Sequence, residues 1–112
     1  MRKNDTVYVR HMLDAAEEAR RFSEGKSRED LTGDRELTLA LVKTIEIIGE
    51  AANKISLEYR NTNPQIPWRS IIGMRNRLIH AYFDINLDIL WQTVADDLPP
   101  LIEALSKIIP RS

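Results

Sequence analysis

Apolar residues recur every three or four positions through most of this chain, which is the spacing of α-helices. The first such stretch, residues 4–24, has Asn4 or Asp5 as its expected N-cap and Gly25 just beyond its end. Charged residues lie largely on its other faces. The apolar face comprises Tyr8, Met12, Ala15, Ala19 and Phe22.

A polar segment with two glycines, residues 25–34, is expected to connect the first helix to the second. Within it, Ser27 and Asp30 have the spacing that caps a short helical turn. Asp34 is the predicted N-cap of a second helix that runs to about Tyr59. Its predicted core positions are Leu37, Leu41, Ile45, Ile48, Ala52 and Ile55.

The second helix is apolar around most of its circumference, because Ala40, Ile47 and Ala51 widen its core stripe. Such a helix is either central in its fold or faces a partner subunit. One narrow polar strip remains, formed by Lys43, Glu46, Glu50 and Asn53. This strip is either an ordinary solvated face or the polar wall of a cleft.

Two prolines mark residues 60–67 as a loop, and Pro67 suits the first turn of a third helix that runs to about Ala81. On a regular helix Asn76 and His80 would share a face, since they are four residues apart. Gly73, one turn earlier, would leave room beside Asn76 for a ligand or another backbone.

Asn86 is the expected cap of the last helix. Pro99 and Pro100 must kink or break that helix, because each proline removes a backbone donor, and Asp96 or Asp97 could cap its second part. The pattern as a whole predicts an all-α fold, an up-down four-helix bundle with a kinked or broken last helix.

Composition narrows the possible chemistry. The 112 residues fit a single domain, 1–112, and their net charge of -1 argues against coating nucleic acid or membranes through bulk charge. Cysteine is absent, so a thiolate nucleophile, a disulfide and a cysteine-ligated metal are excluded. The chain has two histidines, His11 and His80, which leaves little material for histidine-based metal or triad chemistry. We expect no cofactor. We also expect no membrane partner and a cytoplasmic location, because no signal peptide or membrane-spanning run is apparent.

Positive charge is nevertheless concentrated in one segment. Between Tyr59 and Phe83 the chain has no Lys, Asp or Glu and carries +4, which leaves -5 for the remainder. Such a cluster either attracts a phosphate or is simply a basic helix end. The arginines are Arg60, Arg69, Arg75 and Arg77.

Arg75 and His80 are the most interesting pair in this segment. On an ideal helix they lie about 140° apart, so a long side chain, a local distortion or a second copy of the helix must bring them together. Taken alone, His80 fits a structural histidine and Arg75 a surface residue.

The context of this pair resembles a known family. Arg75-x4-His80-x-Tyr82-Phe83, preceded by Ile-Pro-Trp-Arg-Ser-Ile-Ile-Gly-Met at 66–74, resembles the signature of the HEPN superfamily and, more narrowly, of its HepT-like branch, also catalogued as DUF86. Residues 47–52, 90–91 and 97–99 resemble that branch as well. The resemblance therefore covers essentially the whole chain.

The resemblance implies an all-helical, homodimeric ribonuclease toxin of a HepT/MntA toxin–antitoxin pair. Arg75 and His80 would be the catalytic residues in a cleft at the dimer interface, with Asn76 and Arg77 as supporting phosphate contacts. Tyr82 would accept AMP from an MntA-like nucleotidyltransferase antitoxin.

The implied reaction suits the available side chains. RNA carries its own nucleophile, the 2′-hydroxyl, so no metal is needed if acid–base and charge-stabilising groups are in position. Neutral His80 can take the 2′-hydroxyl proton, Arg75 can stabilise the phosphorane, and His80 of a second chain can protonate the leaving oxygen.

Three alternatives remain. The chain could be a non-catalytic HEPN module that binds a nucleotide or accompanies a nucleotidyltransferase, or a purely structural bundle that assembles through its second helix. A metalloenzyme is the least favoured, because Glu46 and Glu50 at i, i+4 are a common pair on solvated helices.

Overall fold

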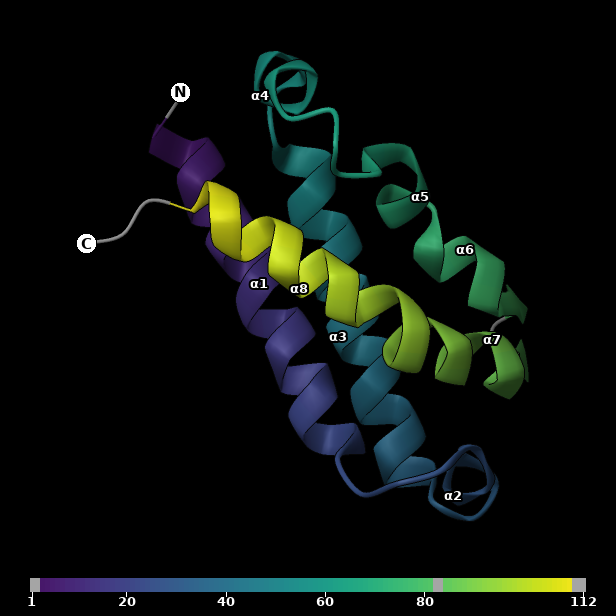
Figure 1. The fold of residues 1–112 in the computed structure, drawn as a ribbon. Coiled ribbons are helices and arrows are strands. Elements are labelled where there is room, and N and C mark those ends of the chain that lie inside the picture. The colour runs from purple at the N-terminus through teal and green to yellow at the C-terminus, as the bar shows by residue number, and fades with distance from the viewer. Residues whose placement is uncertain (1–2, 82–83, 110–112) are drawn as a thin grey trace.

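Helices dominate the fold, as the sequence pattern predicts. The computed structural model describes residues 3–81 and 84–109. Two long helices, α1 (Lys3–Ser23) and α3 (Arg35–Lys54), run antiparallel and pack along each other. A third long element crosses them and contacts α1; it consists of α7 (Leu87–Gln92), the π-helix η1 (Thr93–Asp97) and α8 (Leu98–Ile108) (Figure 1).

The buried side of α1 differs from its predicted face in part. Met12, Ala15 and Ala19 are buried as expected, whereas Phe22 is 40% exposed. The buried surface of the helix is broader than the one predicted stripe, because Val9, Leu13 and Ala16 are buried as well. Gly25, with a φ of 74°, ends the helix in the left-handed conformation that glycine adopts without strain.

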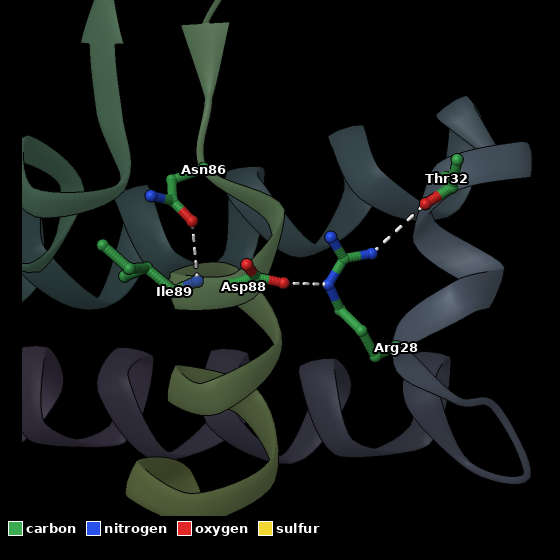
Figure 2. Close-up of polar contacts among 5 residues, drawn as sticks. All are labelled: Arg28, Thr32, Asn86, Asp88 and Ile89. Carbon is green, nitrogen blue, oxygen red and sulfur yellow. Dashed lines mark hydrogen bonds and ion pairs between the residues drawn. The ribbon is translucent and has the colours of Figure 1, made fainter.

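Caps hold the first connection in place. Ser27 is the N-cap of the short helix α2 (Arg28–Gly33), and its backbone N–H donates to the Asp30 carboxylate at 2.7 Å. The predicted turn is confirmed. Asp34 accepts from the backbone N–H of Leu37 at 3.0 Å, which confirms it as the N-cap of α3. Figure 2 shows Arg28 of α2 reaching Asp88 and Thr32, so that α2 is tied to α7.

The central helix α3 carries the core. All six of its predicted core positions are buried, and α3 packs against α1, α2, α5, α6 and α7. It ends at Lys54, however, and not at Tyr59 as predicted. Ser56 begins a separate short helix, α4 (Leu57–Thr62), by accepting from the backbone N–H of Tyr59 at 3.2 Å.

The early end of α3 has a polar cause. The Asp5 carboxylate accepts from the backbone N–H of Ser56 at 2.8 Å and from its hydroxyl at 2.7 Å. The Arg60 guanidinium donates to the carbonyls of Ala52, Asn53 and Ile55 at 3.0 to 3.2 Å. These bonds satisfy the terminal carbonyls of α3 and favour a break over one continuous helix.

The predicted third helix is wrong in length. It forms two short helices, α5 (Trp68–Ile72) and α6 (Met74–Leu78), separated at Gly73. The chain then forms β1 (Ile79–Ala81), which pairs antiparallel with β2 (Asp84–Ile85). The backbone N–H of Asn86 donates to the Leu78 carbonyl at 2.7 Å and so takes the acceptor that a longer helix would use. Asn76 and His80 therefore do not share a helical face.

The last helix bends without breaking. Asn86 caps α7 by accepting from the backbone N–H of Ile89 at 3.0 Å, as predicted (Figure 2). The distortion expected at Pro99 and Pro100 takes the form of η1, where the hydrogen-bond register shifts just before the two residues that lack a donor. Asp97 precedes α8 but its side chain makes no capping bond, so this predicted cap is wrong.

None of the described helices is long and apolar enough to cross a membrane.

Candidate functional site

A small hollow brings together two groups of residues that are far apart in the sequence. It has a volume of about 170 Å³ and lies between α3 and the segment formed by α5 and α6. Its wall on α3 contains part of the predicted polar strip, and its opposite wall contains part of the arginine-rich segment. The lining residues are Glu46, Gly49, Glu50, Asn53, Ile72, Arg75 and Asn76.

Glycine at position 49 lets the two walls come close. A Cβ atom there would lie 3.5 Å from the carbonyl oxygen of Ile71 and 3.7 Å from that of Ile72. The backbone of α3 therefore passes directly beside the end of α5, with room for no more than a methyl group. This approach places Glu46 and Arg75, one turn to either side of the contact, on facing walls.

Arg75 makes one direct side-chain contact in this hollow. Its Nε donates to Oε2 of Glu46 at 2.9 Å. The Arg75 side chain is 50% exposed and that of Glu46 is 27% exposed, so the pair lies at the mouth of the hollow. A half-exposed ion pair contributes at most about 1 kcal/mol, which leaves the guanidinium available to an anion of higher charge.

The two neighbours of Arg75 on α6 face different surroundings. Asn76 is exposed and lines the same hollow as Arg75. Arg77 donates to the Ser70 carbonyl at 3.3 Å and lines a separate hollow between the α5–α6 segment and α8. The structure thus places Arg77 apart from Arg75 and Asn76, although all three are predicted to contact the phosphate.

The four arginines of the positive segment are not one cluster. Arg60 caps the end of α3 and Arg77 lines another hollow, while Arg69 is exposed on α5. Only Arg75 lies beside the carboxylates of α3. The charge count of the segment therefore overstates the positive potential at any single place.

His80 lies on β1, two residues beyond the end of α6. The expected separation of about 140° between Arg75 and His80 does not apply, because the helix ends at Leu78 before it reaches His80. Tyr82, the expected AMP acceptor, lies outside the described residues. The antiparallel pairing of β1 with β2 fixes the course of the backbone through His80.

The polar residues of this hollow are predictable from the sequence, whereas the ion pair within it is not. Glu46 and Arg75 are 29 residues apart, and no local spacing rule connects them. In the parts of the chain that the structure describes, no group of three His, Asp or Glu side chains is placed to hold a metal ion.

Comparison with known proteins identifies the family. Residues 12–108 match the family model described as Ribonuclease HepT-like. No solved structure shows a significant match to this chain.

Curated relatives match over nearly the full chain. A protein of Caldanaerobacter subterraneus subsp. tengcongensis, named a putative RNase, is 37% identical over 109 residues, which cover 97% of each chain. The "Probable ribonuclease HepT" of Thermococcus cleftensis is 34% identical over 96% of this chain and 98% of its own. A larger protein of Methanocaldococcus jannaschii, named "Gamma-glutamylcyclotransferase and putative RNase", is 35% identical over 97% of this chain and 49% of its own. With the family model matching most of its length, this chain belongs to the ribonuclease HepT-like family.

Proposed function

We propose that this protein is a metal-independent endoribonuclease that cleaves RNA with Arg75 and His80 as its catalytic residues. The observation that carries the proposal is the position of Arg75: half-exposed at the mouth of a polar hollow, bonded by its side chain to one carboxylate, and five residues before a histidine that lies two residues beyond the end of the helix. Membership of a family with a ribonuclease name supports the choice of RNA as substrate.

The reaction needs three groups. His80 takes the proton of the RNA 2′-hydroxyl, whose oxygen attacks the neighbouring phosphorus as the bond to the 5′-oxygen breaks. Arg75 stabilises the negative charge that develops on the phosphorane oxygens. An acid then protonates the leaving 5′-oxygen. Asn76, which lines the same hollow as Arg75, is in place to contact the phosphate.

Glu46 has a specific part in this proposal. Its carboxylate holds one edge of the Arg75 guanidinium through Nε and leaves the opposite edge free. A guanidinium that is oriented before substrate binds loses less side-chain entropy when it contacts the phosphate. Glu46 is thus a positioning residue, and Glu50 and Asn53 complete the wall behind it.

A homodimer supplies the missing acid. One chain contains only two histidines, and His11 lies on α1, so the second catalytic imidazole would be His80 of a second chain. We expect a heterodimer of wild-type and His80→Ala chains to have well under half the activity of the wild-type dimer. Full activity per wild-type chain would rule out the shared site.

The cellular role follows from the family resemblance. The chain would act as the toxin of a toxin–antitoxin pair in the cytoplasm, and an MntA-like nucleotidyltransferase would neutralise it by transferring AMP to Tyr82. AMP at that position, two residues from His80, would add a bulky nucleoside and a negative phosphate where RNA must approach.

The test compares the two histidines of the chain. We expect induced wild-type protein to arrest growth and fragment RNA, His80→Ala to do neither, and His11→Ala, an exposed position on α1, to behave like wild type. RNA or nucleotide binding without cleavage, even at high protein concentration, would instead favour the non-catalytic HEPN module.

A further inference from the structure

A second hollow, outside the site described above, combines positive charge with an aromatic ring. It has a volume of about 540 Å³ and lies between the end of α1, the turn that follows, and the junction of α7 with η1. Its lining includes three cations and one carboxylate, so its net charge is +2 in a chain whose total is -1. The charged residues are Arg20, Arg21, Lys26 and Glu24, and the aromatic residue is Trp91.

Two of the three cations are free to bind a ligand. Arg20 donates from Nη1 to the Val94 carbonyl at 3.2 Å, which fixes it against the π-helix. Arg21 and Lys26 are exposed, and no carboxylate of the described residues pairs with either. Attraction to the helix dipole accounts for the arginines at the end of α1 but not for Lys26, which lies beyond the helix.

The two tryptophans of the chain differ sharply in their surroundings. Trp68 is buried, donates from Nε1 to the Asn63 carbonyl at 3.0 Å, and contacts the Tyr59 ring edge-on. Trp91 is half-buried, and within the described ranges neither an aromatic ring nor a cation stacks on it. Its Nε1–H has no hydrogen-bond acceptor among the same residues. An indole left open beside unpaired cations has the chemistry of a platform for a nucleic-acid base.

We propose that this second hollow binds single-stranded RNA, with a base stacked on Trp91 and phosphates held by Arg21 and Lys26. The choice of RNA as ligand rests on the proposed ribonuclease function. Trp91 lies five residues after Asn86, about 7 Å along the axis of α7, and Asn86 directly follows β2, the partner strand of β1. An RNA strand of a few nucleotides is long enough to cover this axial distance, and in this proposal it contacts both Trp91 and the backbone around His80, so that the second hollow contributes affinity and orientation to the substrate.

The experiment measures binding without cleavage. In a His80→Ala background, an unstructured RNA 12-mer is titrated, and both the dissociation constant and tryptophan fluorescence are recorded at several salt concentrations. Trp91→Leu removes the platform but keeps apolar volume, and Arg21→Gln with Lys26→Gln removes charge without touching the core. The matched control is Arg10→Gln with Lys107→Gln, which removes two exposed charges elsewhere on the surface.

We expect RNA to quench the fluorescence and Trp91→Leu to weaken binding by about fivefold or more. Loss of Arg21 and Lys26 should lower the slope of log Kd against log salt by about 1.4, while the control pair leaves it unchanged. Inorganic polyphosphate, which has no bases, should not quench. The inference is overturned if both variants bind like the parent protein, or if the control pair weakens binding equally.

Cleavage separates this inference from the proposed function. A chain with native His80 that binds RNA through Trp91 but never cuts it would refute the ribonuclease and leave the second hollow as an RNA site. A chain that cuts RNA with Trp91→Leu as well as it does unsubstituted would refute the second hollow alone.

Discussion

Arg60 and Arg75 belong to the same positively charged stretch, yet the fold uses them in opposite ways. The Arg60 guanidinium donates to three backbone carbonyls at the end of α3 and is largely occupied by the protein itself. The Arg75 side chain is half-exposed and bonded to one carboxylate at the mouth of a hollow. The two arginines differ in their partners, which the charge count of the stretch does not reveal, and this difference makes Arg75 rather than Arg60 the candidate for contact with a ligand.

The largest expected effect concerns catalysis. We expect Arg75→Ala to lower the rate of RNA cleavage by about 100- to 1000-fold, because the charge on the phosphorane loses its stabilising partner. Its thermal unfolding should stay close to wild type, since a half-exposed ion pair adds little stability. Arg69→Ala, an exposed arginine of the same stretch, is the control for both assays. Equal activity of the two variants would remove Arg75 from the mechanism.

The converse effect is expected at Arg60. Arg60→Ala should lower the free energy of unfolding by about 2 kcal/mol, because the last carbonyls of α3 lose charge-assisted hydrogen bonds. Cleavage per folded molecule should be unchanged. Urea unfolding followed by circular dichroism measures the first quantity, and an activity assay normalised to the folded fraction measures the second. A stability equal to wild type would contradict the structural role.

A smaller effect, on the kinetics of cleavage, is expected at Glu46, which we propose positions Arg75. Glu46→Gln removes a negative charge beside the anionic substrate and weakens the hold on Arg75. We therefore expect KM for RNA and kcat both to fall, each by about two- to fivefold, in keeping with an ion pair worth less than about 1 kcal/mol. Asp88→Asn, which breaks the ion pair between α2 and α7, serves as the control with an equal change in charge. An unchanged KM and kcat in Glu46→Gln would leave the carboxylate without this role.

The smallest effect concerns pH. Burial, and secondarily the Asp5 carboxylate, raise the pKa of Tyr59 above its ordinary value of 10.0. Its contribution to stability is therefore fully present below about pH 10, the unfolded-state pKa, and is lost as the pH rises through the folded-state pKa. Tyr59→Phe should lose less stability than wild type between neutral and strongly alkaline pH. Identical alkaline unfolding of the two proteins would contradict this assignment.

The helical elements with strong local signals were predictable. The core stripe of α3 and the caps at Ser27, Asp34 and Asn86 follow from spacing and side-chain chemistry within a few residues, and the structure confirms them. The exposed position of Phe22 could not be foreseen from spacing alone, because the last turn of α1 buries Ala19 and Ser23 and leaves Phe22 40% exposed.

The predicted helix ends are wrong where contacts between residues far apart in the sequence override the local preference for a helix. The end of α3 depends on Asp5, which lies 51 residues before Ser56 in the sequence. The end of α6 at Leu78 depends on pairing with residues 84–86. For the same reason the sequence predicts Glu46 and Arg75 as separate candidates but not their contact, which requires α3 and α6 to be packed together.

The central claim is that Arg75 and His80 promote attack by the RNA 2′-hydroxyl. The most direct test is an end-group analysis of RNA fragments produced by the purified protein in a chelator of divalent cations. We expect a 2′,3′-cyclic phosphate on one fragment and a free 5′-hydroxyl on the other, with both products lost in His80→Ala and strongly reduced in Arg75→Ala. Fragments that carry a 5′-phosphate, or cleavage that persists in both variants, would contradict it.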